Sequence, residues 1–260
     1  MAEKIEAILI DVDGCIVPTN GDVSPGFYYG LEAISIWVKK ASQGKFPSIG
    51  FCSGRDRNYV EAVSFFVGLP NSWSVIESGV ALFNPATKEL ALNPDLTDGM
   101  KKVFKEITDK RIPKILEKHP ELFLYPGNMI CVALERKQGT KLSIENAYEA
   151  VKKEMADFHQ RRLVQITHSD CAVDISPFGI DKASGLQFLS QHTGINLKKT
   201  LGIGDSNGDF PLFKKVGYVG CPKNASKECK SLVKKRGGFI SPFAYAEGVV
   251  DVIKHFLKKG

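Results

Sequence analysis

Two acidic turns, far apart along the chain, most constrain how this sequence can fold. The turn Asp11-Val12-Asp13-Gly14-Cys15 closes the short apolar run Lys4–Val12, and Asp205-Ser206-Asn207-Gly208-Asp209 follows the run Leu201-Gly202-Ile203. Short apolar runs that enter polar turns are typical of buried strands in a parallel sheet. Ligand sites in such sheets lie beyond the carboxyl ends of the strands. We therefore expect a sheet that brings four carboxylates to one crevice.

Strand-like and helix-like segments alternate at both ends of the chain. In the first part we expect strands at 4–12, 46–52, 73–76 and 80–83, with helices at 25–40 and 56–67. In the last part we expect helices at 181–193 and 244–258 and strands at 200–203 and 216–220. Alternation of this kind predicts an α/β fold with a doubly wound parallel sheet.

Residues 84–177 interrupt the alternation. After an initial loop we expect a lysine-rich helix at 98–118 and a second helix at 143–158. We also expect three short strands, at 129–135, 163–167 and 172–175. This order favours an inserted α+β module. We therefore expect a core formed by residues 1–83 and 178–260, with residues 84–177 inserted as a lid.

Composition excludes several classes of protein. The 260 residues are 43% hydrophobic and 25% charged, which is sufficient for a large buried core. No run approaches the roughly 18 apolar residues of a membrane span, and the N-terminus lacks a signal-peptide pattern. The six cysteines form no CxxC pair and no zinc-like cluster, which indicates free thiols. We expect a cytoplasmic protein without a membrane partner.

Positive charge is concentrated near the C-terminus. The net charge is +6, and residues 214–260 hold eleven Lys or Arg against three Asp or Glu. Aromatic residues are sparse there and no nucleic-acid-binding motif is present, so we expect a solvated basic face rather than a nucleic-acid partner. A non-enzymatic anion or nucleic-acid binder is an alternative, and it predicts affinity that falls steeply with salt.

The two acidic turns also indicate a metal. Four carboxylates that meet in one crevice repel one another, which raises their pKa values and costs stability. A divalent cation removes the conflict, and oxygen ligands favour Mg²⁺ over zinc. Asp and Gly also form turns and helix caps without any ligand, but two such turns, each at a strand end, favour the metal site.

Two further segments suit the binding of a phosphate group. Ser53-Gly54-Arg55 follows the expected strand 46–52, and a hydroxyl with free N–H groups at a helix start can hold an anion. Lys182 opens the helix 181–193, where its charge would stabilise a moving phosphoryl group. Alone, the first segment is equally compatible with a helix cap, and the second would be interpreted as a solvated surface lysine. No Walker A loop or GxGxxG is present.

In this order, the four segments resemble the haloacid dehalogenase (HAD) superfamily of phosphohydrolases. Asp11-Val12-Asp13-Gly14 corresponds to its DxDG motif, Ser53 to its Ser/Thr, Lys182 to its lysine and the stretch 204–209 to its acidic fourth motif. The insertion point, together with Glu77-Ser78-Gly79, is similar to the type IIB (Cof-like) cap subgroup. That subgroup includes phosphoglycolate, sucrose-phosphate and mannosyl-3-phosphoglycerate phosphatases. The resemblance implies a Rossmannoid core with an inserted cap.

The resemblance also implies roles for the acidic residues. Asp11 would be the nucleophile that forms an aspartyl-phosphate, and Asp13 would protonate the leaving group and then activate water. Mg²⁺ would bind the Asp11 carboxylate, the Asp13 carbonyl and Asp205, with Asp209 as a direct or water-mediated ligand. Ser53 and the Gly54 N–H would hold the phosphoryl oxygens.

The remaining implications concern the reaction. Lys182 would offset charge that develops during phosphoryl transfer. The resemblance implies a Mg²⁺-dependent phosphatase of a small phosphomonoester, either a sugar phosphate or a phosphoglycolate-like acid. A phosphotransferase or phosphomutase on the same scaffold, similar to phosphomannomutase, is the alternative, and a receiver-type signalling module is a further one. The substrate and the oligomeric state stay open.

Three positions depart from the family pattern. Gly208 stands where relatives usually carry Asn, and Ser78 stands where Asn is common. Neither change removes a carboxylate, so we expect activity to be retained. Cys15 replaces a frequent Thr, and we expect it to be a buried packing residue.

Overall fold

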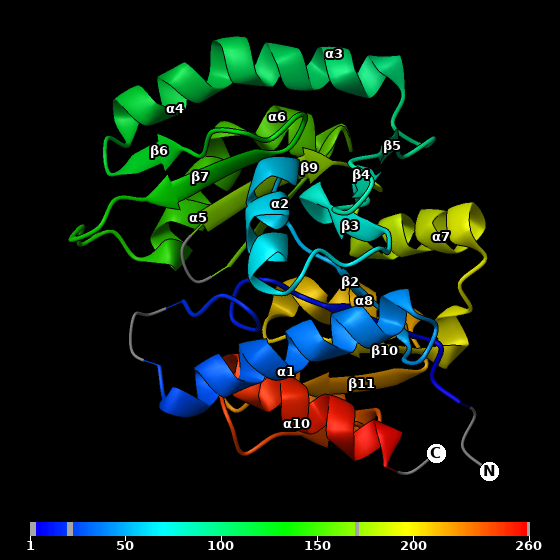
Figure 1. The fold of residues 1–260 in the computed structure, drawn as a ribbon. Coiled ribbons are helices and arrows are strands. Elements are labelled where there is room, and N and C mark those ends of the chain that lie inside the picture. Colours follow the sequence, from blue (N-terminus) through cyan, green and yellow to red (C-terminus); the bar gives the residue numbers. More distant parts are fainter. Residues whose placement is uncertain (1–3, 20–22, 170–171, 259–260) are drawn as a thin grey trace.

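A five-stranded parallel sheet, in the order β12-β11-β10-β1-β2, forms the centre of the fold (Figure 1). The computed structural model describes residues 4–19, 23–169 and 172–258. The strands of the parallel sheet are β1 (Ala7–Ile10), β2 (Ser48–Phe51), β10 (Thr200–Ile203), β11 (Tyr218–Cys221) and β12 (Phe239–Ile240). The predicted parallel sheet is confirmed, whereas the short edge strand β12 was not predicted.

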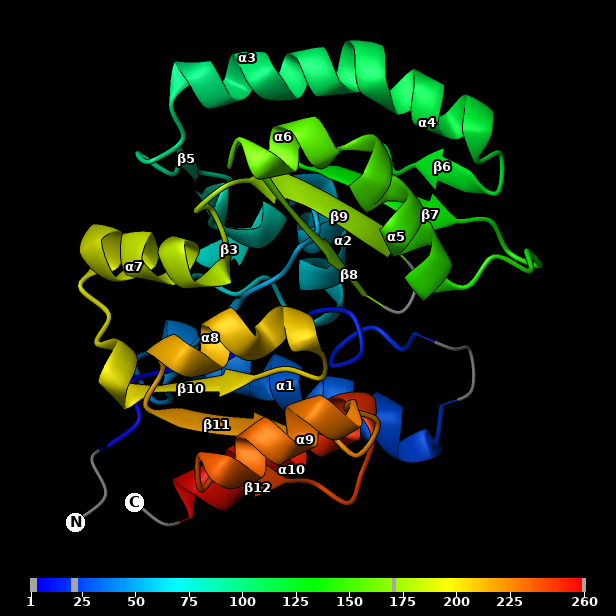
Figure 2. The same cartoon turned by 180° about the vertical axis from the view of Figure 1, so that it is seen from behind.

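Helices cover both faces of this sheet (Figures 1 and 2). One face packs against α1 (Pro25–Ser42), α2 (Arg57–Phe66) and α10 (Tyr245–Leu257). The other packs against α7 (Lys182–Thr193), α8 (Phe210–Lys215) and α9 (Lys227–Lys235). Within β1, Ile8 and Ile10 pack with the helices of the first face, and Leu9 packs with those of the second. This follows from the alternation of side chains along a strand. The doubly wound class is therefore confirmed.

The strands predicted at 73–76 and 80–83 are present but do not belong to the parallel sheet. They are β3 (Ser74–Ile76) and β4 (Ala81–Phe83), which form an antiparallel sheet with the unpredicted β5 (Leu90–Leu92). A parallel pair needs a crossover of a dozen or more residues. Only the 3₁₀ turn η1 (Glu77–Gly79) and Val80 join β3 to β4, so the chain must reverse there.

A second layer, the antiparallel module (residues 98–177), lies over the parallel sheet (Figure 1). Its strands, in the order β6-β7-β9-β8, are β6 (Leu122–Leu124), β7 (Val132–Arg136), β9 (Ala172–Pro177) and β8 (Val164–His168). Its helices are α3 (Asp98–Glu106), α4 (Ile112–Lys118), α5 (Ile144–Glu154) and α6 (Ala156–Gln160). One face of the sheet packs on these helices in a separate apolar core.

Both helices predicted in this module are interrupted. The segment 98–118 contains a π-helical turn, Ile107–Arg111, between α3 and α4. Pro113 has no N–H to donate to the carbonyl of Asp109, and this disturbs regular α-helical pairing at that turn. The segment 143–158 breaks at Met155, whose backbone (φ −105°, ψ 11°) is not helical. Strand β6 was not predicted at all.

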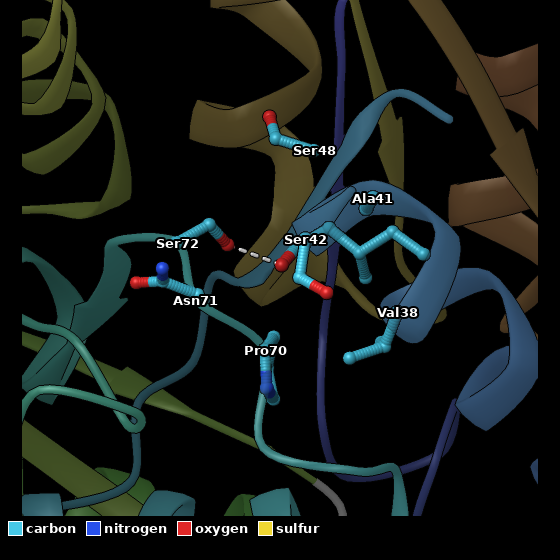
Figure 3. Close-up of a pocket in the computed structure, with 8 residues that line it drawn as sticks. Val38, Ala41, Ser42, Ser48, Pro70, Asn71 and Ser72 are labelled. Carbon is cyan, nitrogen blue, oxygen red and sulfur yellow. Dashed lines mark hydrogen bonds between the residues drawn. The ribbon is translucent and has the colours of Figure 1, made fainter. Parts of the chain in front are cut away.

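Two hollows are present, and neither is lined by residues of the two acidic turns. One, of about 20 Å³, lies beside the start of β2, where Ser72 donates a hydrogen bond to the Ile49 carbonyl (Figure 3). The other, of about 390 Å³, lies within the antiparallel module between α3 and residues 124–132. Among the described residues, every helix is too short or too polar to cross a membrane.

Helix α7 is seated against η1 through two glycines. A Cβ atom added at Gly185 would lie 2.6 Å from the Gly79 Cα and 2.6 Å from Val75 Cγ1. We predict that Gly185→Ala lowers the free energy of unfolding by roughly 1–3 kcal/mol, because the core there has no room for a methyl group. Urea unfolding of the variant measures this change.

The matched control is Gln187→Ala, an exposed position on the same helix. We expect its free energy of unfolding to stay within about 0.5 kcal/mol of the wild-type value. A Gly185→Ala variant as stable as this control would contradict the packing argument.

Candidate active site

Three neighbouring strands direct their following loops to one edge of the parallel sheet. β1 pairs in parallel with both β2 and β10, and Ile10 is in register with Phe51 and Ile203. Asp11 directly follows β1, and Asp205 lies two residues beyond β10. The two acidic turns therefore meet at the carboxyl ends of the strands, as predicted from the sequence. The connections that follow β1 and β10 diverge at this point, which is where ligands bind in doubly wound sheets.

A buried lysine joins the two turns. Lys182 Nζ lies 3.1 Å from Asp11 Oδ1 and 2.7 Å from Asp209 Oδ1. Lys182 and Asp11 are 6% and 7% exposed, and Asp209 is fully buried. Burial alone would lower the pKa of Lys182, but Asp11 and Asp209 together raise it well above its ordinary value. The lysine is therefore charged, and the surface-lysine interpretation is excluded.

The start of α7 fixes the position of this lysine. Asp181 caps the helix by accepting a hydrogen bond from the Ser184 N–H at 2.9 Å, and the Ser184 hydroxyl is 3.0 Å from the Asp181 N–H. This reciprocal cap orders the first turn. Lys182 is the first residue of the helix and extends into the site from there.

The fourth motif is folded around the Asp209 carboxylate. Its Oδ2 accepts hydrogen bonds from the N–H groups of Asp205 and Ser206, at 2.9 and 3.1 Å. On the opposite side, the first turn approaches so closely that a Cβ at Gly14 would lie 2.1 Å from Asp205 Oδ2. Gly14 also has a φ of +74°, so both its backbone and its lack of a side chain are required.

The acidic cluster fits a divalent cation. Asp11, Asp205 and Asp209 each place a carboxylate oxygen within 4.8 Å of the others. Burial raises the pKa of Asp11 well above its ordinary value, and Asp209 and Asp205 raise it further, while Lys182 opposes the shift. A cation among the three carboxylates would relieve this repulsion, and their hard oxygen atoms suit Mg²⁺.

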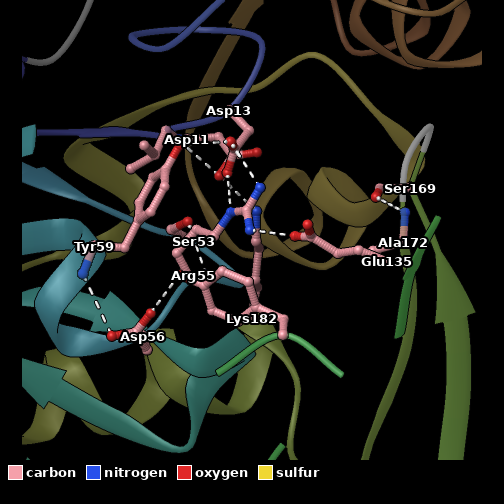
Figure 4. Close-up of polar contacts among 12 residues, drawn as sticks. Asp11, Asp13, Ser53, Arg55, Asp56, Tyr59, Glu135, Ser169, Ala172 and Lys182 are labelled. Carbon is pink, nitrogen blue, oxygen red and sulfur yellow. Dashed lines mark hydrogen bonds and ion pairs between the residues drawn. The ribbon is translucent and has the colours of Figure 1, made fainter. Parts of the chain in front are cut away.

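Asp13 is held by hydrogen bonds from Arg55 and Tyr59 (Figure 4). Arg55 Nε donates to Asp13 Oδ2 at 2.8 Å, and Arg55 Nη2 donates to Asp13 Oδ1 at 3.2 Å. The Tyr59 hydroxyl donates to Oδ1 at 3.1 Å. The side chain of Asp13 remains 32% exposed, so it is accessible from the crevice.

Ser53 and Gly54 lie at the neighbouring strand end. Ser53 is 1% exposed, and its hydroxyl oxygen accepts a hydrogen bond from the Arg55 N–H at 3.1 Å. Gly54 is exposed, and a Cβ there would lie 3.3 Å from Ser78 Oγ. The structure therefore places Ser78, a departure from the family pattern, beside the predicted phosphate-binding glycine.

Sequence reasoning gave no role to several polar residues that attach the antiparallel module to the core. Glu77 is fully buried and accepts hydrogen bonds from the N–H groups of Met129, Ile130 and Cys131 at 2.5, 3.1 and 3.2 Å. Burial raises the pKa of Glu77, although these three donors oppose the shift. In the sequence, Glu77 stood out only as part of the segment Glu77-Ser78-Gly79, which resembles the type IIB cap subgroup.

Two further contacts join the same parts. Asp56, the N-cap of α2, accepts a hydrogen bond from the Tyr125 hydroxyl at 2.8 Å. Arg55 Nη1 donates to Glu135 Oε1 at 2.7 Å. Arg55 stands in the motif that identified Ser53, but only the structure shows that it contacts a residue of β7.

The first turn is also fixed from the C-terminal side. The Asn224 side-chain amide donates to the Gly14 carbonyl at 2.8 Å, and its oxygen accepts from the Tyr245 N–H at 2.8 Å. Cys15 is fully buried, and burial raises the pKa of its thiol well above its ordinary value. Its expected packing role is confirmed. The described cysteines are free thiols, and Cys171 lies outside the described residues.

The chain is similar to known proteins along nearly its whole length. Residues 135–253 match the family of haloacid dehalogenase-like hydrolases. The chain is 30% identical to a phosphoglycolate phosphatase of Methanothrix thermoacetophila, over 98% of this chain and 99% of that protein. It is 26% identical to a phosphoglycolate phosphatase of Thermoplasma volcanium, over 97% of this chain and 98% of that one.

The fold is also found in a solved structure. The sucrose-phosphatase of Synechocystis sp., crystallised with sucrose and phosphate, aligns with a TM-score of 0.68 at 19% identity, and the alignment covers 97% of this chain and 98% of that one. The fold, the acidic cluster and the relatives agree with one another. The chain therefore belongs to the haloacid dehalogenase-like hydrolase family, and it is a phosphatase.

Proposed function

We propose that this phosphatase is Mg²⁺-dependent and hydrolyses a small phosphomonoester through an aspartyl-phosphate on Asp11. One observation carries the proposal: the charged Lys182 is buried between Asp11 and Asp209, with an Asp205 oxygen within 4.8 Å of theirs. Buried charges are costly unless they are paired, and such clusters concentrate at functional sites. Three carboxylates against one ammonium leave a net negative charge that suits a divalent cation.

In the first step, Asp11 attacks phosphorus. Its Oδ1 accepts a hydrogen bond from the Val12 N–H at 2.8 Å and pairs with Lys182. Because both contacts use Oδ1, we assign Oδ2 as the attacking oxygen. The bond from phosphorus to the ester oxygen breaks, and that oxygen leaves with the electron pair.

The phosphoryl group is held by groups from three loops. The Ser53 hydroxyl and the Gly54 N–H bind its oxygens, and Lys182 offsets the charge that develops on them. The Asp11, Asp205 and Asp209 carboxylates and the Asp13 carbonyl would hold Mg²⁺, which would supply positive charge to neutralise the phosphoryl oxygens.

Asp13 moves the protons. It gives a proton to the departing alkoxide and then accepts one from the water that attacks the aspartyl-phosphate. Its carboxylate lies on the solvent-accessible side of the site, with 32% of its side chain exposed, where both a leaving group and water can reach it.

The substrate is small because residues 84–177 act as a lid over the crevice. The antiparallel module falls within this range and lies over the carboxyl ends of the parallel strands (Figure 1). The names of the relatives support a phosphorylated acid or sugar as the substrate. We propose that residues 1–83 and 178–260 form the catalytic core.

We predict that Asp11→Asn lowers Mg²⁺-dependent phosphate release by about 10³-fold or more, because an amide cannot form the covalent intermediate. Phosphate release from a panel of phosphorylated sugars and acids, with Mg²⁺ or with EDTA, measures the loss. The control is Asp98→Asn, since the Asp98 side chain is 88% exposed on the antiparallel module. Release that persists in Asp11→Asn and vanishes with EDTA would refute the assigned nucleophile.

We predict that Asp13→Asn slows the hydrolysis of an alkyl phosphate by about 10²–10⁴-fold. We expect a smaller loss in the rate of aspartyl-phosphate formation from p-nitrophenyl phosphate, because p-nitrophenolate departs without a proton. Single-turnover rates for the two substrates separate these effects. Equal losses on both would be inconsistent with proton donation by Asp13.

A further inference from the structure

Arg55 connects the core to the antiparallel module through a single guanidinium group. Two of its nitrogens donate to the two oxygens of Asp13, at 2.8 and 3.2 Å. The third donates to Glu135 of β7 at 2.7 Å (Figure 4). Glu135 and Arg55 are 18% and 20% exposed, so this pair is largely shielded from water. Such charge-assisted bonds are stronger and more directional than those between neutral groups.

We propose that Glu135 is a positioning residue which, through Arg55, orients Asp13 to accept a proton from the attacking water. This inference rests on the proposed function, because it takes the acid–base role of Asp13 from it. Glu135 itself touches neither the phosphoryl group nor the water.

The planarity of the guanidinium explains how Glu135 acts at a distance. The donors of Arg55 lie in one rigid plane, so a bond at one end fixes the direction of the others. Two tyrosine rings lie near the guanidinium carbon, Tyr59 of α2 at 4.7 Å and Tyr125 of the antiparallel module at 5.1 Å. Loss of the bond to Glu135 would leave this plane free to turn and would loosen its hold on Asp13.

The arrangement favours the second half of the reaction. A carboxylate accepts two bonds from a guanidinium best when it is ionised, and the ionised form is the one that accepts a proton. Water then attacks phosphorus, the bond from phosphorus to Asp11 breaks, and Asp11 leaves with the electron pair. The proton of the water passes to Asp13. Because Glu135 belongs to the antiparallel module, this step requires that module to be seated on the core.

The test is rapid mixing of Glu135→Gln with p-nitrophenyl phosphate in the presence of Mg²⁺. Formation of the aspartyl-phosphate needs no proton for this leaving group, so we expect a burst of about one p-nitrophenolate per site. Steady turnover should then be about 10–100-fold slower than in the wild type. Because the phosphorylated enzyme accumulates, kcat and KM should fall together and kcat/KM should stay near the wild-type value.

The control is Tyr125→Phe. This variant removes the 2.8 Å hydrogen bond from the Tyr125 hydroxyl to Asp56, which also joins the module to the core and is similar in length to the bond between Arg55 and Glu135. The Tyr125 ring beside Arg55 and the bond from Arg55 to Glu135 stay in place. We expect the ratio of burst to steady rate in this variant to match that of the wild type. Thermal unfolding of both variants shows whether they are folded.

A folded Glu135→Gln protein that lacks the burst would overturn the inference. This holds both for a variant with unchanged kcat and for a variant in which only KM changes. A burst of equal size in Tyr125→Phe would also overturn it, because loosening of the module would then explain both results. Failure of the proposed function is distinguishable, since the wild type would then release no phosphate from any phosphomonoester.

Discussion

The ion pairs of Lys182 with Asp11 and Asp209 are the interaction on which the rest of the site depends. One ammonium group, 3.1 and 2.7 Å from two carboxylates, joins segments that are 171 and 27 residues away from it in the sequence. All three side chains are buried or nearly so, and removal of one partner would leave a buried charge unpaired. The cap of α7 and the folded turn around Asp209 hold these groups in place. The structure thus maintains an acidic cluster that the lysine only partly neutralises.

The parallel sheet supplies this cluster, and the antiparallel module supplies its surroundings. The parallel register of β1, β2 and β10 places the loops that follow them at the same end of the sheet. Asp11, Ser53 and Asp205 therefore lie near one another without the need for contacts between their side chains. The module is then attached through Glu77, Asp56 and Arg55, each of which lies in a loop or helix start next to that edge. Arg55 and Asp56 directly follow Ser53 and Gly54, which are proposed to bind phosphate, and the Glu77 N–H donates to the Arg55 carbonyl at 2.9 Å.

Much of this was predictable because it depends on local patterns. Apolar runs followed by acidic turns identified β1 and β10. Because ligand sites of parallel sheets lie beyond the carboxyl ends of the strands, Asp11 and Asp205 were then expected to meet. The reversal between β3 and β4 was missed because both runs were counted among the alternating strands, although the three residues between the expected ranges are too few for a parallel crossover. The contact between Arg55 and Glu135 was also beyond the sequence. It joins residues 80 positions apart across two sheets, and no local pattern specifies how two such layers are superposed.

The central claim is that Asp11, Asp205 and Asp209 form a divalent-cation site. Thermal unfolding of the wild type and of Asp205→Asn, each with EDTA or with Mg²⁺, tests it without reference to any substrate. Mg²⁺ at about 100 times its dissociation constant should stabilise the wild type by about 2.7 kcal/mol. Asp205→Asn should lose most of this gain because one of the three carboxylates that would hold the cation is gone. A wild type indifferent to Mg²⁺, or a variant that keeps the full gain, would contradict the account.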